Sequence, residues 1–171
     1  MERINYLFTK GLGLVIALAV INFACSKDEE EQNLVDQIIE EVRDLTSNYH
    51  DIEQAIAAGW AVDLSGCVAH PTEGGMGHHF GRLEYIDGRV NHLEPQILLY
   101  EPQADGSYEF VGVEYIVPFE ILPADAEAPE LFEQQFHPNP QLNLWALHVW
   151  TERENTRGMF YDWNPNVSCI E

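Results

Sequence analysis

The sequence predicts an α+β fold, in which an N-terminal helical segment packs on a curved antiparallel sheet of four or more strands. Apolar residues recur every three to four positions between Leu34 and Leu45, as they do on one face of an amphipathic helix. Farther along, the pattern changes to alternating strands that are separated by turn residues such as Asp105-Gly106. One helical layer against one antiparallel sheet is the simplest arrangement that buries both apolar faces.

A second, shorter helix is expected directly after the first one. Thr46, Ser47 and Asn48 are residue types that can cap its N-terminus. Residues 49–56 supply the apolar side chains of its inner face, and Gly59 is placed to end it.

Four strands are predicted in the rest of the chain, at residues 77–86, 96–101, 108–117 and 142–151. The link between the second and the third strand is so short that these strands must pair antiparallel. The Gly-rich segment 72–77 is predicted to be a loop whose backbone approaches another segment closely, or a tight turn. The Pro- and acid-rich segment 118–140 is a candidate lid or binding loop, with a solvated insertion as the alternative.

The first 25 residues have the pattern of a targeting signal. Basic residues occur near the start, residues 11–23 form an apolar run that is too short to span a bilayer comfortably, and the small residue Ala24 precedes Cys25. An abruptly acidic segment, Ser26-Lys27-Asp28-Glu29-Glu30, follows the cysteine.

This pattern resembles bacterial lipoprotein signals, in which the cysteine is acylated and becomes the first residue of the mature chain. One departure is Asn22, where such signals usually carry Leu. The acidic segment after Cys25 resembles the signal that sends lipoproteins of Bacteroidetes-type bacteria to the outer face of the outer membrane. The resemblance implies an outer-membrane, lipid-anchored protein, with the cell surface favoured over the periplasmic face. An ordinary secretory signal and an uncleaved anchor are the alternatives.

Cleavage before Cys25 would give three parts: a signal peptide (residues 1–24), an acidic tether (residues 25–33) and one globular domain (residues 34–171). Removal of the first 24 of the 171 residues leaves 147 residues, enough for one domain with a substantial core. We expect the tether to be a mobile spacer because it is polar and acidic.

The chain is strongly acidic, with 8 Lys and Arg residues against 29 Asp and Glu residues and a formal net charge of −21. Such a surface repels the phosphates of nucleic acid and of anionic lipids, so nucleic acid is not an expected partner. We expect the protein to attach to the membrane through its lipid anchor and not through a basic surface. The sequence does not identify a protein partner. Cations are attracted, although solubility alone explains most of the carboxylates.

Cys67 and Cys169 remain once Cys25 is assigned to lipid. In an oxidising compartment, an even pair without a C-x-x-C motif favours a disulfide over a metal-ligating or catalytic cysteine. The bond would close a loop of about a hundred residues and hold the C-terminal segment beside the end of the helical region.

Three ligand-type side chains interrupt apolar strand faces. Alternation along the predicted strands places His79, Glu114 and His148 each in a row of mostly apolar residues. Two histidines and a carboxylate on neighbouring strands form the ligand set of a two-His-one-carboxylate metal site. A cation would also relieve the cost of burying an unpaired Glu114. The sequence therefore predicts a site for a divalent transition metal (Zn, Fe or Cu).

Other interpretations of these residues stay open. Arg82 or Arg89 could pair with Glu114, and each histidine could be a hydrogen-bonded core residue or an exposed one. A register slip of one residue would turn His78 inward in place of His79. Further reserve ligands are Glu94, Glu101 and His137.

Aromatic residues crowd the second half of the chain: Tyr100, Tyr115, Trp145, Trp150, Phe160, Tyr161 and Trp163. Most of them fit a core, but a rim of Trp and Tyr around a pocket would also suit a sugar or another apolar ligand. The sequence has no P-loop, no G-x-G-x-x-G and no G-x-S-x-G motif. Nucleotide hydrolysis, dinucleotide binding and serine-hydrolase chemistry are therefore unsupported.

A second resemblance covers most of the mature chain. It is carried by Gly74-Gly75-Met76-Gly77 followed by His79, by Leu98-Leu99-Tyr100-Glu101-Pro102, Val113-Glu114-Tyr115 and Leu147-His148-Val149-Trp150, and by the end at Cys169. These segments resemble a widespread group of secreted bacterial proteins to which we can attach no activity.

The functional hypothesis is an envelope-tethered lipoprotein whose extracytoplasmic domain binds a small ligand or a transition-metal ion in a sheet pocket. A metal-dependent oxygenase or hydrolase is one alternative, and a surface adhesion or assembly module is another. The sequence leaves open whether the protein is an enzyme.

Overall fold

The computed structural model describes the backbone of residues 15–169 and the side chains of residues 29–169. The chain divides into two compact units, residues 1–37 and residues 38–171. Much of the predicted signal, and the side chain of Cys25, lie outside the described part of the chain.

Helix α1 (Val15–Thr46) begins well before the apolar pattern that predicted it. Residues 26–33, which we expected to be a mobile tether, continue this helix. They contain neither Gly nor Pro and are rich in Glu, a good helix former. Across residues 15–169, we find no helix with the length and apolar character that membrane crossing requires.

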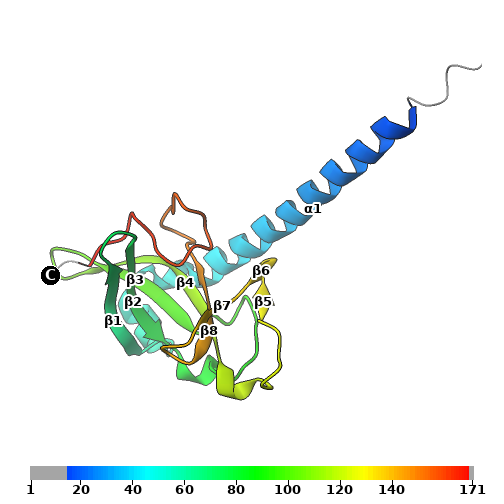
Figure 1. Ribbon diagram of the computed structural model, residues 1–171. Coiled ribbons are helices and arrows are strands. Elements are labelled where there is room, and N and C mark those ends of the chain that lie inside the picture. Colours follow the sequence, from blue (N-terminus) through cyan, green and yellow to red (C-terminus); the bar gives the residue numbers. More distant parts are fainter. Residues whose placement is uncertain (1–14, 170–171) are drawn as a thin grey trace, which may run out of the picture. The chain divides into compact units, whose positions relative to one another are not determined.

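The second unit has the predicted α+β architecture (Figure 1). Its helical part consists of the last residues of α1, the 3-10 helix η1 (Ser47–His50) and α2 (Ile52–Ala57). The cap of α2 is Asp51, whose side chain accepts a hydrogen bond from the Glu53 backbone N–H. The predicted caps at residues 46–48 are wrong because residues 47–50 form the 3-10 turn instead.

The main sheet has six antiparallel strands in the order β1-β2-β3-β4-β8-β7. They are β1 (Val62–His70), β2 (Gly74–Gly81), β3 (Ile97–Pro102), β4 (Tyr108–Pro118), β7 (His137–Asn139) and β8 (Leu144–Val149). The short strands β5 (Glu130–Leu131) and β6 (Gln134–Gln135) form a separate ribbon. Two more 3-10 helices are η2 (Leu83–Tyr85) and η3 (Phe119–Ile121). Four strands of the main sheet were predicted, whereas β1 and β7 were not.

In the Gly-rich segment 72–77, residues 74–77 belong to β2, so the loop prediction is wrong for them, whereas residues 72 and 73 lie in the turn between β1 and β2. The close backbone approach predicted for it is confirmed. A Cβ on Gly74 would lie 2.1 Å from the backbone O of Asn164, and one on Gly75 would lie 2.8 Å from that of Val167. Glycine is therefore required where the C-terminal segment crosses β2.

Both faces of the sheet are apolar, and they bury different partners. The side chain of Tyr100 points to the helices, where its hydroxyl donates a hydrogen bond of 2.6 Å to the Tyr49 carbonyl O. On the opposite face Leu99 and Trp150 belong to a buried cluster that also contains Val167 of the C-terminal segment. The C-terminal segment thus helps to cover the face of the sheet that lies away from the helices.

The predicted disulfide between Cys67 and Cys169 is confirmed, and it spans 102 residues of sequence. It joins β1 to the end of the described chain. A backbone bridge between Gly75 and Asn164 holds the same segment a few residues earlier.

Segment 118–140 is anchored in the fold through its second half. Phe132 and Phe136 are buried, and the ring of Phe132 contacts those of Tyr115 and Phe160. The alternative of a solvated insertion is therefore wrong for this half of the segment.

Candidate metal centre

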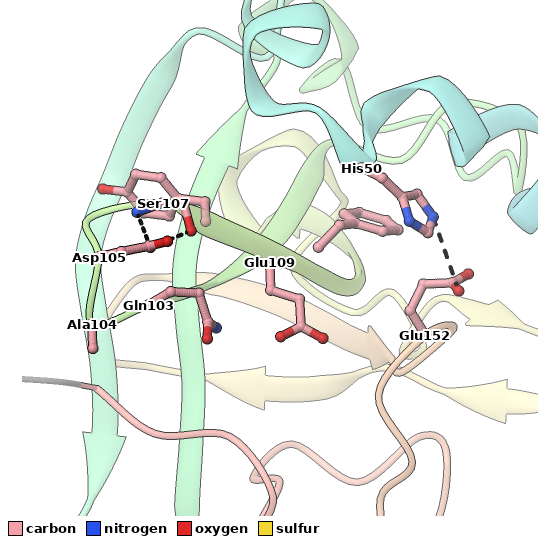
Figure 2. A pocket seen from close by; sticks show the side chains of 9 residues that line it. His50, Gln103, Ala104, Asp105, Ser107, Glu109 and Glu152 are labelled. Carbon is pink, nitrogen blue, oxygen red and sulfur yellow. Dashed lines mark hydrogen bonds and ion pairs between the residues drawn. The ribbon is translucent and has the colours of Figure 1, made fainter.

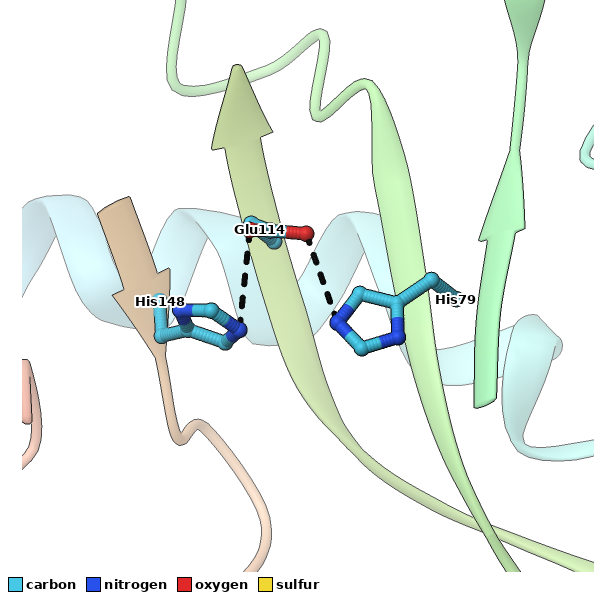
Figure 3. A group of neighbouring side chains, drawn as sticks. All are labelled: His79, Glu114 and His148. Carbon is cyan, nitrogen blue, oxygen red and sulfur yellow. Dashed lines mark ion pairs between the residues drawn. The ribbon is translucent and has the colours of Figure 1, made fainter. Parts of the chain in front are cut away.

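His79 on β2, Glu114 on β4 and His148 on β8 converge on the face of the sheet that lies away from the helices (Figure 3). One potential ligand atom of each residue lies within 4.8 Å of those of the other two. Glu114 lies between the imidazoles, with Oε2 3.6 Å from His79 Nε2 and Oε1 3.5 Å from His148 Nε2. The structure thus brings together the three residues that the sequence analysis selected.

Strand pairing explains this convergence. Glu114 is directly opposite His148 in the β4–β8 ladder. β3 separates His79 from β4: His79 pairs with Leu99, which in turn pairs with Gly112. Because Gly112 precedes Glu114 by two residues, both lie on the same face of β4, and His79 reaches Glu114 on a diagonal across β3.

The three side chains are buried, with 7% of His79, 6% of Glu114 and 3% of His148 exposed. Among the described residues, neither ring nitrogen of His148 has a hydrogen-bond partner. The two contacts to Glu114 exceed the roughly 2.7–2.9 Å of a charge-assisted hydrogen bond. Buried polar groups normally have hydrogen-bond partners, and the described side chains do not supply such partners to the ring nitrogens of His148.

Burial also shifts the ionisation of the group. It lowers the pKa of His79 to about 3, an effect to which the nearby His148 adds. It raises the pKa of Glu114 against the opposing effect of His148. Burial alone would lower the pKa of His148, but the carboxylates of Glu114 and Asp162 outweigh it and raise this pKa. The metal-free pair of Glu114 and His148 therefore retains a proton strongly.

Two further residues, Ser65 and Asp162, lie near the Nδ1 atoms of His79 and His148, which are the ring nitrogens that do not face Glu114. Ser65 Oγ lies 2.8 Å from His79 Nδ1. Asp162 Oδ1 lies 3.4 Å from His148 Nδ1 and 3.0 Å from Nδ1 of the half-exposed His137. His148 and His137 lower the pKa of Asp162 although its partial burial acts in the opposite direction.

The geometry could hold one metal ion. Zinc lies about 2.0–2.2 Å from imidazole nitrogens and carboxylate oxygens, so two of its ligands are at most about 4.4 Å apart. The contacts of 3.5 Å and 3.6 Å to Glu114 fall within this limit, and the nitrogens of the two imidazoles lie within 4.8 Å of each other, so a bound ion would draw them together by at most a few tenths of an ångström. Three protein ligands would leave at least one coordination position for water or another small molecule.

The reserve ligands do not join this centre. His78 Nδ1 lies 2.8 Å from Asp63 Oδ2, so the register slip that would turn His78 inward did not occur. Glu101 pairs with Arg153 at 2.8 Å and accepts a hydrogen bond from the Ser168 N–H. His137 is not one of the grouped ligand residues, but its Nδ1 lies 3.0 Å from Asp162, which contacts His148.

The predicted arginine partners of Glu114 are engaged elsewhere. Arg82 lies 3.3 Å from Glu84 and over the ring of Tyr85, and Arg89 pairs with Asp87 at 2.7 Å. The last reserve ligand, Glu94, lies 3.8 Å from Arg89.

Neither of the two hollows seen in the described part of the chain lies at the triad. Two open hollows of about 730 Å³ and 490 Å³ share His50, Ser107 and Tyr108 in their linings, and neither is lined by a triad residue (Figure 2). Most of the polar groups of the larger hollow already have partners, such as Asp105 with Ser107.

Ser65 and Asp162 were missed as site residues. Neither belongs to a predicted strand, and neither lies in a ligand motif. The one available signal was the pair of residue types itself, since histidine ligands commonly donate their outer N–H to a carboxylate or another oxygen.

Comparison of the chain with models of protein families, with curated proteins and with solved structures found no significant match.

Proposed function

We propose that the protein is an envelope-tethered lipoprotein whose extracytoplasmic domain binds a divalent transition-metal ion through His79, Glu114 and His148. The main support for the metal site is that the buried carboxylate of Glu114 lies between two imidazole nitrogens, 3.6 Å from that of His79 and 3.5 Å from that of His148. These separations are long for hydrogen bonds but suit three ligands of one ion.

Charge balance supports a dication. With both histidines neutral, Glu114 contributes one negative charge, and Asp162 contributes another next to His148. A divalent ion would neutralise both charges within the buried centre, where uncompensated charge is costly. Histidine and carboxylate ligands suit Zn, Fe and Cu, whereas Ca and Mg prefer sites made of oxygen alone.

Metal binding without catalysis is the preferred form of the proposal, because the triad is buried and the two hollows lie elsewhere. A metal-dependent oxygenase or hydrolase is the second candidate. It is supported by the small number of protein ligands, since catalytic sites often use three and keep a position open. Turnover that is lost on chelation and restored by the metal would favour this candidate.

Elemental analysis of full-length protein from its native envelope tests the metal centre. We expect about one equivalent of Zn, Fe or Cu in the wild type and almost none in His148→Ala. His50→Ala is the control, because this half-exposed histidine lies outside the triad. Absence of all three metals from the wild type, together with failure to bind them when added, would refute the centre.

The lipid anchor is a separate part of the proposal, and its support is the sequence around Cys25. Mass spectrometry of the native protein should show loss of residues 1–24 and an acylated N-terminal cysteine. The Cys25→Ala variant should no longer be found in the membrane fraction. Cleavage by protease added to intact cells would place the domain on the cell surface, and protection of a demonstrably cleavable domain would place it on the periplasmic face.

A further inference from the structure

Each of the two proposed ligand histidines contacts, through its Nδ1 atom, a residue outside the proposed ligand set: His79 contacts Ser65 and His148 contacts Asp162. Ser65 lies on β1, where a bulge separates the pairs formed by Asp63 and Cys67. Gly66 takes a positive φ of 65° within this bulge, and its N–H donates to Asp63 Oδ1 at 3.0 Å. Bulges re-aim side chains, and this one directs Ser65 to His79.

The Ser65 hydroxyl determines which nitrogen of His79 carries the proton. A serine has one proton to donate, and Ser65 Oγ donates it to the Gly66 carbonyl O at 2.7 Å. The contact of 2.8 Å to His79 Nδ1 therefore requires that Nδ1–H donates to Ser65 Oγ. The unprotonated Nε2 of His79 then faces Glu114.

Asp162 has the corresponding position behind His148. Its loop is fixed on both sides, because the Trp150 indole N–H donates to the Tyr161 carbonyl O at 2.7 Å and the Asn155 amide donates to the Trp163 carbonyl O at 3.1 Å. An ionised carboxylate only accepts hydrogen bonds. Asp162 Oδ1 lies 3.4 Å from His148 Nδ1, longer than a normal hydrogen bond, so it is the negative charge of Asp162 that favours a proton on Nδ1 and leaves Nε2 to face Glu114.

We infer that Ser65 and Asp162 are positioning residues of the metal centre: each fixes the proton of one histidine on Nδ1, so that both Nε2 atoms face Glu114 as ligands. The inference rests on the proposed metal site and extends it to two residues that would not touch the ion. Outer partners of this kind commonly change metal affinity by about 10–100-fold.

Zinc competition titrations on the full-length protein test the two residues. We expect Ser65→Ala and Asp162→Asn each to weaken zinc binding by about 10–100-fold. Ser65→Thr keeps the hydroxyl and should restore the affinity. Glu154→Gln is the control for Asp162, because it removes an exposed carboxylate from the same loop.

Nitrogen-15 NMR of the imidazole rings gives a readout that a purely structural role would not move. In metal-free wild type, His79 should be neutral and protonated at Nδ1, and in the zinc form both histidines should bind through Nε2. The opposite tautomer of His79, or zinc affinities of both variants equal to wild type, would overturn this inference alone. Wild type that binds no zinc, iron or copper would overturn the metal centre itself.

Discussion

Glu114 and His148 face each other across β4 and β8, with Oε1 and Nε2 separated by 3.5 Å and both side chains almost fully buried. A pair that formed only a salt bridge in such a place would be expected at a shorter distance, because its mutual attraction must offset the removal of both groups from water. His79 approaches the other carboxylate oxygen at a similar distance. The Glu114 carboxylate thus lies between the Nε2 atoms of His79 and His148, an arrangement that suits three ligands of one metal ion.

Glu114→Gln should weaken metal binding and also destabilise the metal-free fold. The amide is nearly isosteric but uncharged, so zinc affinity should fall by about 70- to 900-fold, which is the share of one ligand when about 10–16 kcal/mol is divided among the four ligands of a structural zinc site. The free energy of unfolding of the metal-free protein should fall as well, because removing one partner of a buried pair leaves His148 without its carboxylate. Zinc titration and urea denaturation in chelator measure the two effects.

The control for this variant is Glu120→Gln, which changes an exposed carboxylate. Wild-type zinc affinity in Glu114→Gln would contradict its assignment as a ligand.

Zinc should stabilise the folded domain. At a free concentration of 100 times Kd, a ligand that binds only the folded state adds about 2.7 kcal/mol to the free energy of unfolding. Thermal or urea denaturation with zinc, and again after added EDTA, measures this gain and its reversal. His79→Ala should lose the response, whereas His70→Ala, at an exposed position on β1, should keep it. An equal response in both variants would place the bound zinc elsewhere.

Metal affinity should fall as the pH falls. The raised pKa values of Glu114 and His148 mean that this pair stays protonated to higher pH than the free side chains, and a metal ion must displace that proton. Below these pKa values the apparent affinity should decrease by about tenfold per pH unit for each proton displaced, and above them it should level off.

Calorimetry in two buffers with different ionisation enthalpies measures the protons released as zinc binds. Release close to zero throughout the range between about pH 5 and about pH 8 would contradict this assignment of protons.

Loss of the disulfide should destabilise the fold. The bond between Cys67 and Cys169 closes a loop of 102 residues. The chain-entropy model gives about 4.7 kcal/mol for a loop of this size, so Cys67→Ser with Cys169→Ser should lower the free energy of unfolding by about 2–5 kcal/mol. Urea denaturation measures the difference. A reductant should destabilise the wild type and leave the double variant unchanged, and equal sensitivity of the two would contradict the prediction.

The triad could be found from the sequence because strand alternation is a local and regular property. A polar residue in an apolar row of a predicted strand must face the same environment as its neighbours, which selected Glu114 and His148. The antiparallel link around Asp105-Gly106 was also predictable, since short hairpin loops allow few geometries.

The supporting residues could not be found in this way. Ser65 faces the centre because a bulge in β1 redirects it. The same bulge interrupts the alternation that begins at Val62 and Leu64, and this hid β1 itself. Asp162 lies in an irregular loop that is positioned by hydrogen bonds from Trp150 and Asn155. These contacts depend on tertiary structure and have no sequence period.

The strand order also bears on when the ion would be acquired. His79, Glu114 and His148 lie far apart in sequence, and β3 must be in place between β2 and β4 before they meet. No short segment of the nascent chain can collect them, so the ion would enter only after the sheet has assembled. A polypeptide exported in an unfolded state would consequently draw its metal from the pool outside the cytoplasm, and the supply there would help to decide which element it carries.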